Sequence, residues 1–138
     1  MNVLFVCKGN VARSQIASEL FNKYTGLKSG SAGIKVGKPG NIIKDEGEFA
    51  VPVIENMLKE NIDISNNRRT LLTEDMAKNY DRIVILCEKS IVPEYILNNN
   101  GAIFWEIEDP AGQEADKWKI IIEKIRKLIK EFIAENNL

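Results

Sequence analysis

The sequence contains no histidine among its 138 residues. Imidazole is the usual base for serine and cysteine nucleophiles and a common zinc ligand, so its absence excludes Ser-His and Cys-His catalysis and most zinc sites. Only two cysteines occur, Cys7 and Cys87, which are too few for a disulfide framework or a structural zinc site. We expect no metal or cofactor, and any nucleophilic thiol must be ionised by a group other than imidazole.

The chain also lacks a strong excess of charge and a long apolar run. Its formal net charge of -1 gives no basic surface for nucleic acid or an anionic membrane. No apolar stretch approaches the roughly 18 residues that span a bilayer, and the N-terminal one is too short for a secretion signal. We therefore expect a single cytoplasmic domain over residues 1–138, with reduced cysteines and no nucleic-acid or membrane partner.

The apolar residues predict strands that alternate with helices. Buried strands are predicted at residues 2–6, 82–87 and 102–107, with a weaker one at 28–34. Helices are predicted at residues 13–24 with a stop at Gly26, at 49–61, after an N-cap at Thr73, and from about Gln113 onward. Residues 35–48, rich in glycine and polar side chains, are predicted to form a long loop. This alternation indicates an α/β domain with a parallel sheet covered on both faces.

The segment "CKGNVARS" follows the first predicted strand directly. Cys7 begins a loop of the kind that binds ligands in parallel sheets, and Arg13 opens the next helix. The main-chain N–H groups between them can converge on an anion, with the helix N-terminus behind them. Gly9 permits a close approach, and Asn10 tolerates a left-handed backbone. We predict that this positive environment stabilises the thiolate form of Cys7 without histidine.

Within this loop, Arg13 offers two parallel donors to a tetrahedral oxyanion, and Ser14 can donate a hydrogen bond to the sulfur. The predicted substrate-binding residues are consecutive, with Lys8 and Val11 at the rim: Lys8, Gly9, Asn10, Val11, Ala12, Arg13 and Ser14. A buried structural cysteine is the alternative, since free cysteine is commonly buried. The position after a strand, the Gly-Asn pair and the serine after the arginine favour a nucleophile.

The sequence resembles the low-molecular-weight protein tyrosine phosphatases and the arsenate reductases built on the same fold. The resemblance covers nearly the whole chain and rests on Cys7, Gly9, Asn10, Arg13, Ser14, the Ser31-Ala32-Gly33 segment and Asp109-Pro110. It implies a doubly wound, four-stranded parallel sheet flanked by helices on both faces. It also implies that Cys7 is the nucleophile, Arg13 the phosphate-binding residue and Asp109 the general acid.

Asp109 follows the predicted strand at residues 102–107, so it lies in another loop that could face Cys7. Cleavage of a phosphate ester expels an alkoxide or phenoxide, which a carboxylic acid must protonate. Pro110 biases Asp109 toward an extended backbone and helps to fix its direction. Asp-Pro pairs also often cap or turn a chain, so the assignment of Asp109 as the acid depends on the Cys7 loop.

Two enzymatic functions fit these residues. The preferred one is a phosphomonoesterase of the protein-tyrosine type, with a phosphocysteine intermediate on Cys7. The alternative is an arsenate reductase in which Cys87 attacks the Cys7 adduct and an external thiol protein, thioredoxin or glutaredoxin, reduces the resulting disulfide. Cys87 and the sequence "DPAG" favour the reductase, but "EKSIVPEY" after Cys87 supplies no further thiol. Across these two functions, the substrate of the protein would be a phosphotyrosine protein, a small phosphomonoester or arsenate.

Two other functions are weakly supported, and the phosphatase pattern itself is incomplete. A phosphocysteine carrier of sugar transport, or a simple anion-binding module, would leave Arg13 and Asp109 unexplained. Many phosphatases of this kind place aromatic residues after Asp-Pro to hold a phosphotyrosine ring, whereas this chain has Ala111-Gly112 there. Residues 35–48 contain no aromatic residue either.

Overall fold

The computed structural model describes residues 1–110, 112 and 114–138. Within these residues, four parallel strands are arranged in the order β2-β1-β3-β4. The strands are β1 (Val3–Cys7), β2 (Gly30–Gly33), β3 (Arg82–Ile85) and β4 (Ala102–Phe104). The helices are α1 (Arg13–Thr25), α2 (Val51–Leu58), α3 (Glu74–Ala77), α4 (Glu94–Leu97), α5 (Ala115–Glu135) and the 3-10 helices η1 (Ile43–Phe49) and η2 (Lys89–Ile91). The predicted α/β fold with a four-stranded parallel sheet is confirmed.

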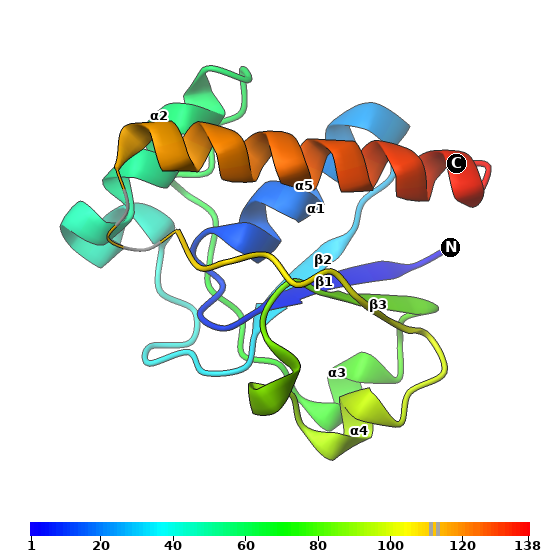
Figure 1. The fold of residues 1–138 in the computed structure, drawn as a ribbon. Helices are drawn as coiled ribbons and strands as arrows, with labels where there is room; N and C mark the ends of the chain where they lie inside the picture. Colours follow the sequence, from blue (N-terminus) through cyan, green and yellow to red (C-terminus); the bar gives the residue numbers. More distant parts are fainter. Residues whose placement is uncertain (111, 113) are drawn as a thin grey trace.

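Helices cover both faces of the sheet, with α1, α2 and α5 on one face and α3 and α4 on the other (Figure 1). All five residues of β1 are buried, because the strand is central and successive side chains point to opposite faces. Phe5 and Cys7 pack on the α1/α5 side, whereas Leu4 and Val6 pack on the α3/α4 side. Apolar side chains therefore pack against both faces of the sheet along β1, as far as Cys7.

The two long helices follow the predicted apolar patterns. Gly26 ends α1 in a left-handed conformation (φ 74°), and its N–H donates to the carbonyl of Asn22, as expected of a helix C-terminus. The stripe of α5 that faces the core consists of Trp118, Ile121, Ile122, Ile125, Ile129 and Phe132. No helix in the described part of the chain is long and apolar enough to cross a membrane.

Several predicted boundaries were wrong. Residues 35–48 are not loop throughout, because η1 occupies Ile43–Phe49, with a break at Gly47 (φ 72°, ψ -148°). The helix predicted at 49–61 is limited to α2, with Pro52 in its first turn. The strands predicted at 82–87 and 102–107 end at Ile85 and Phe104. Gln113 lies outside the described residues. The N-cap at Thr73 is confirmed, since its hydroxyl accepts a hydrogen bond from the Met76 N–H (3.1 Å).

This topology places the Cys7 loop at the carboxyl edge of the sheet. The chain passes from β1 to β2 on one side and then returns to β3 on the other, so the order of the strands reverses next to β1. In open parallel sheets, ligands bind in the crevice at such a reversal point. The loop between β1 and α1 starts there (Figure 1).

Candidate active site

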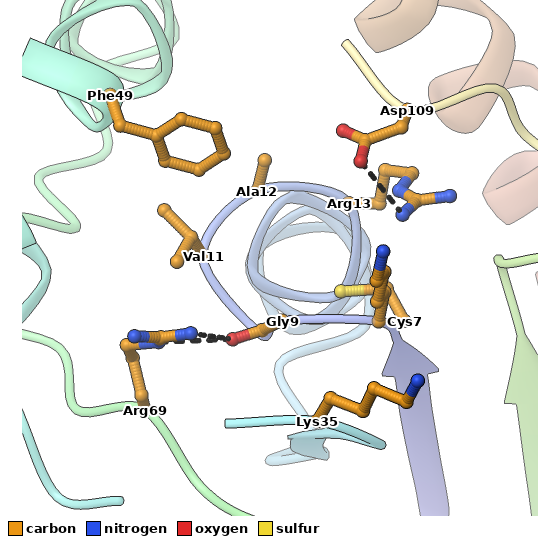
Figure 2. Close-up of a pocket in the computed structure, with 10 residues that line it drawn as sticks. Cys7, Gly9, Val11, Ala12, Arg13, Lys35, Phe49, Arg69 and Asp109 are labelled. Atoms are coloured by element: carbon orange, nitrogen blue, oxygen red, sulfur yellow. Dashed lines mark hydrogen bonds and ion pairs between the residues drawn. The ribbon is translucent and has the colours of Figure 1, made fainter. Parts of the chain in front are cut away.

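A cavity of about 250 Å³ opens at this carboxyl edge. The residues that line it are Cys7, Lys8, Gly9, Val11, Ala12, Arg13, Lys35, Phe49, Arg69 and Asp109 (Figure 2). The structure therefore brings the predicted nucleophile, the predicted arginine and the predicted acid to one space. Lys35, Phe49 and Arg69 also line the cavity, and the sequence did not single them out.

The main chain of the loop wraps around the Cys7 sulfur. The Asn10 N–H donates a hydrogen bond to Cys7 Sγ over 3.3 Å, and Asn10 has the left-handed backbone (φ 58°) that its residue type tolerates. Gly33 at the end of β2 lies directly against this loop, where a Cβ atom would come within 2.9 Å of the Asn10 nitrogen. The Ser31-Ala32-Gly33 segment therefore packs against the back of the loop and requires glycine at its last position.

A chain of side-chain hydrogen bonds fixes the direction of the Ser14 hydroxyl. The Thr70 N–H donates to Asn10 Oδ1 (2.8 Å), which orients the Asn10 amide so that its Nδ2 donates to Ser14 Oγ (2.7 Å). Because Ser14 Oγ accepts this bond, its own proton is available to the Cys7 sulfur 3.0 Å away. A hydroxyl that donates to sulfur stabilises the thiolate relative to the thiol.

Asn10 and Ser14 are fully buried and belong to this internal chain, whereas the cavity is lined by the other predicted loop residues. Gln15 reinforces them, because its Nε2 donates to the Asn10 carbonyl (3.2 Å) and to the Arg68 carbonyl (3.2 Å). The Ser14 hydroxyl thus contacts the sulfur, and the Asn10 side chain contacts Ser14 and the main chain of Thr70.

Arg13 is held in place by main-chain carbonyls from two other loops. Its Nη1 donates to the carbonyls of Leu86 (3.3 Å) and Ile107 (2.9 Å), which follow β3 and β4. Its Nη2 lies 3.8 Å from Asp109 Oδ2 (Figure 2). Only 3% of Arg13 is exposed, so the guanidinium is fixed and largely desolvated at the wall of the cavity. Such a planar group suits bidentate binding of a tetrahedral oxyanion.

The N-terminus of α1 adds further positive potential. Its N-cap residue, Ala12, makes no side-chain capping hydrogen bond, and the first turn contains no acidic residue. The N–H groups at a helix start carry a partial positive charge, which a bound anion can satisfy. The described residues contain no group of three or more histidine, cysteine or carboxylate side chains that could hold a metal ion. The arrangement suits an oxyanion.

Lys35, Phe49 and Arg69 reach the cavity from segments distant in sequence. Lys35 is joined to the loop by a hydrogen bond from its N–H to the Lys8 carbonyl (2.8 Å). Phe49, at the end of η1, is 48% exposed and places an aromatic ring beside the cavity (Figure 2). No local motif marks any of the three, since only tertiary packing brings them here.

Cys87, the predicted redox residue, lies on the other side of the sheet from Cys7. It is fully buried in the apolar cluster between the sheet and α3/α4, and it is not among the residues that line the cavity. Burial, with a smaller contribution from Cys7, raises the pKa of Cys87 to about 11, although Arg13 opposes this shift. Cys87 is therefore a protonated thiol at neutral pH.

The comparison with known proteins identifies the family. The model of the low molecular weight phosphotyrosine protein phosphatase family matches residues 2–137. The chain belongs to this family. An arsenate reductase of Bacillus cereus (strain 03BB102) is 33% identical over 135 residues, which cover 94% of this chain and 92% of the relative. The family resemblance expected from the sequence is confirmed.

Two solved structures of the family show the same fold. The low molecular weight protein tyrosine phosphatase from T. tengcongensis has a TM-score of 0.80 and 27% identity, and the match covers 98% of this chain and 99% of that protein. The arsenate reductase from Archaeoglobus fulgidus DSM 4304 has a TM-score of 0.72 and 27% identity, with 96% and 98% covered. The chain is thus similar to enzymes with both named activities.

Proposed function

We propose that the protein is a phosphomonoesterase of the protein-tyrosine type that forms a phosphocysteine intermediate on Cys7. The observation that carries this proposal is the grouping of Cys7, Arg13 and Asp109 around one cavity, with the Phe49 ring at its side. The first residue supplies a nucleophile, the second binds an oxyanion and the third supplies a proton. The reaction requires each of these parts.

In the first step, the Cys7 thiolate attacks phosphorus in line with the leaving oxygen. The sulfur–phosphorus bond forms, the bond from phosphorus to the leaving oxygen breaks, and its electron pair passes to that oxygen. Arg13 and the main-chain N–H groups of the loop bind the non-bridging oxygens, whose charge must be held as the bonds change. The Ser14 hydroxyl, 3.0 Å from the sulfur, stabilises the Cys7 thiolate before this attack and again in the second step, when the sulfur leaves phosphorus.

Asp109 donates a proton in the first step and accepts one in the second. As a carboxylic acid it protonates the leaving alkoxide or phenoxide, and it becomes a carboxylate. The carboxylate then takes a proton from water as that water attacks the phosphocysteine and the sulfur–phosphorus bond breaks. Half of the Asp109 side chain is exposed, at the mouth of the cavity, where a leaving group and a water molecule can reach it. The thiolate and the acid are both regenerated.

Phe49 supports an aryl substrate. The two residues directly after Asp109-Pro110 are Ala111 and Gly112, neither of which is aromatic, and Ala111 lies outside the described residues. Phe49 supplies an aromatic surface from η1 instead, and aromatic rings prefer offset or edge-to-face contact with one another. The ring of a phosphotyrosine whose phosphate is bound by the Cys7 loop would contact the Phe49 side chain.

Arsenate reduction is the second candidate function, and the curated relatives named arsenate reductase favour it. Reduction of arsenate needs two electrons, which the Cys7 and Cys87 thiols would supply as they are oxidised to a disulfide, and thioredoxin or glutaredoxin would then reduce that disulfide. Cys7 and Cys87 belong to core clusters on opposite faces of the sheet, and both are buried. A disulfide between them would require the segment after β3 to rearrange, which makes this the less favoured function.

Purified protein tests both functions directly. We expect hydrolysis of p-nitrophenyl phosphate and of a phosphotyrosine peptide in the presence of EDTA, and complete loss of both activities in Cys7→Ser. Parallel assays with arsenate and thioredoxin or glutaredoxin would measure arsenite. Hydrolysis that survives Cys7→Ser contradicts the proposed mechanism. Arsenite formation that is lost in Cys87→Ala, without phosphatase activity, would establish the reductase instead.

A further inference from the structure

The peptide group between Gly9 and Asn10 joins the Cys7 sulfur to Arg69. At one end, the Asn10 N–H donates to Cys7 Sγ (3.3 Å). At the other end, the Gly9 carbonyl accepts hydrogen bonds from Arg69 Nε (3.0 Å) and Nη2 (2.9 Å). Figure 2 shows the Arg69 guanidinium pointing at this carbonyl from the side of the cavity. Arg69 therefore touches the opposite end of the peptide group that contacts the sulfur.

The orientation of this peptide group is not the one that the backbone prefers locally. Asn10 has a φ of 58°, a left-handed conformation that carries a steric cost for residues other than glycine. Rotation of the peptide plane would relieve that conformation, and Gly9 offers little resistance because it has no Cβ. The rotation would turn the Gly9 carbonyl oxygen toward the sulfur and the oxyanion site, where its partial negative charge is unfavourable. A contact outside the loop must oppose it.

Arg69 is itself fixed by contacts on the side away from the loop. Its Nη1 forms an ion pair with Glu46 Oε1 (2.8 Å), and Asn41 donates to the same oxygen (2.7 Å). Burial opposes ionisation of Glu46, but the hydrogen bonds from Asn41 and Arg69 hold its pKa below the usual value. The Arg69 main chain bonds to the Asn41 carbonyl (2.9 Å) and to the Gly40 N–H (2.7 Å). The guanidinium is therefore anchored before it reaches Gly9.

We propose that Arg69 is a positioning residue for the nucleophile. It locks the Gly9–Asn10 peptide group so that the Asn10 N–H points at the Cys7 sulfur, and it polarises that group so that the N–H is a stronger donor. Arg69 acts through Gly9 and Asn10, not by contact with the sulfur. The inference rests on the proposed role of Cys7 as a nucleophile, and it holds for phosphate and arsenate chemistry alike.

Alkylation of Cys7 by iodoacetamide tests this role without any substrate. The rate is measured from pH 5 to pH 9, and mass spectrometry quantifies the modified peptide that contains Cys7. Among the described residues, the ionisable side chains that line the cavity with Cys7 are Lys8, Arg13, Lys35, Arg69 and Asp109, and Cys87 interacts electrostatically with Cys7. The Arg69→Met substitution removes only Arg69 from this set. A change in the pH dependence of the alkylation rate therefore reports the loss of that one group.

We expect the midpoint of the alkylation profile to move upward by about one pH unit in Arg69→Met, because a hydrogen bond to a charged group is weakened. We expect kcat/KM for p-nitrophenyl phosphate to fall by about 10- to 100-fold. Arg69→Lys retains a charge and one donor, so it should recover part of both losses. Glu46→Gln keeps both bonds from Arg69 to Gly9 and should move the midpoint less than Arg69→Met.

Lys35→Met is the control that distinguishes the hydrogen bonds from Arg69 to Gly9 from a general effect of positive charge. It removes a cation from the same cavity without removing a hydrogen bond to Gly9. An equal shift in Lys35→Met and Arg69→Met would overturn the proposal. So would a folded Arg69→Met with a wild-type profile, even if its melting temperature falls. If Arg69→Met does not fold, the comparison of Arg69→Lys with Lys35→Met decides in the same way. Wild-type Cys7 that reacts no faster than a free thiol would instead refute the proposed function.

Discussion

The Arg13 guanidinium and the Asp109 carboxylate lie 3.8 Å apart, although one residue begins α1 and the other follows β4. Both residues line the cavity that also contains the Cys7 sulfur. In the proposed reaction, the group that binds the oxyanion and the group that protonates the leaving oxygen would therefore be neighbours. An ester oxygen bound in this cavity would lie between a cation that holds the phosphoryl group and a carboxyl group that can protonate the alcohol.

Substitution of Asp109 should affect turnover according to the leaving group. We expect Asp109→Asn to lower kcat for phenyl phosphate by about 100- to 1000-fold, because phenoxide needs a proton as it departs. The loss should be smaller for p-nitrophenyl phosphate, whose leaving group is stable as an anion. Inhibition by inorganic phosphate should change little, since Arg13 and the loop remain. Steady-state kinetics on both substrates measures the difference.

Glu108 offers a matched control for that experiment. It is adjacent in sequence, but its carboxylate forms an ion pair with Lys117 (2.7 Å), and it does not line the cavity. We expect Glu108→Gln to change kcat by less than about twofold, because Glu108 does not line the cavity and an exposed ion pair contributes little to the stability of the fold. Equal losses in Glu108→Gln and Asp109→Asn would show that the acid has been assigned to the wrong residue.

The parts of the fold and of the site that could be predicted are those with a local signal. The apolar run of β1, the glycine after α1 and the apolar stripe of α5 each reflect a regular backbone that buries one side. The common location of Cys7, Gly9 and Arg13 at one cavity could be predicted because they belong to one short loop that directly follows a strand. The position of Asp109 at the same cavity could be predicted only together with the Cys7 loop, because Asp-Pro alone is also typical of a turn or a helix cap.

The parts that could not be predicted depend on tertiary contacts. Arg69 reaches Gly9 only because an isolated parallel bridge between Gly33 and Leu71 brings its segment alongside β2. The 3-10 helix η1 has no period of 3.6 residues, so its glycine and polar residues resemble a loop. Cys87 could be placed at the carboxyl edge of the sheet, but the face on which its side chain lies depends on where β3 ends.

Phe49 should contribute to the binding of the aryl group and not to the binding of phosphate. We expect Phe49→Ala to raise KM for a phosphotyrosine peptide by about 3- to 10-fold, which corresponds to the loss of one aromatic contact. Inhibition by inorganic phosphate should stay at the wild-type level. Val51→Ala is the matched control, because Val51 is a similarly exposed apolar residue that does not line the cavity. Equal effects of the two substitutions would contradict a specific contact.

Cys87 should make the protein less stable in alkaline solution. Below its ordinary pKa of 9.0, this thiol is protonated in the folded and the unfolded states, so it adds no pH dependence. Between pH 9.0 and about 11 the unfolded state loses the proton first, so the free energy of unfolding falls as pH rises. The expected loss is about 2 kcal/mol at pH 11. Urea unfolding from pH 8 to pH 11 measures it.

Cys87→Ala serves as the reference for this measurement, because lysine and tyrosine titrate in the same range in both proteins. We expect the variant to be less stable at pH 8 by about 1 kcal/mol, since it loses a buried sulfur atom. The difference from wild type should then narrow or reverse by pH 11. Parallel profiles for the two proteins would show that burial does not hold the Cys87 proton.

Gly33 should be required for catalysis more than for stability. A Cβ at this position would lie 2.9 Å from both the Asn10 nitrogen and the Gly9 carbonyl carbon, and main chain cannot yield as a flexible side chain can. We expect Gly33→Ala to displace the loop and to lower kcat/KM by about 100-fold, with weaker inhibition by phosphate. Gly37→Ala is the control, because a Cβ there meets no atom within 4 Å, and it should retain activity. Wild-type kinetics in a folded Gly33→Ala would show that the position of the loop does not depend on β2.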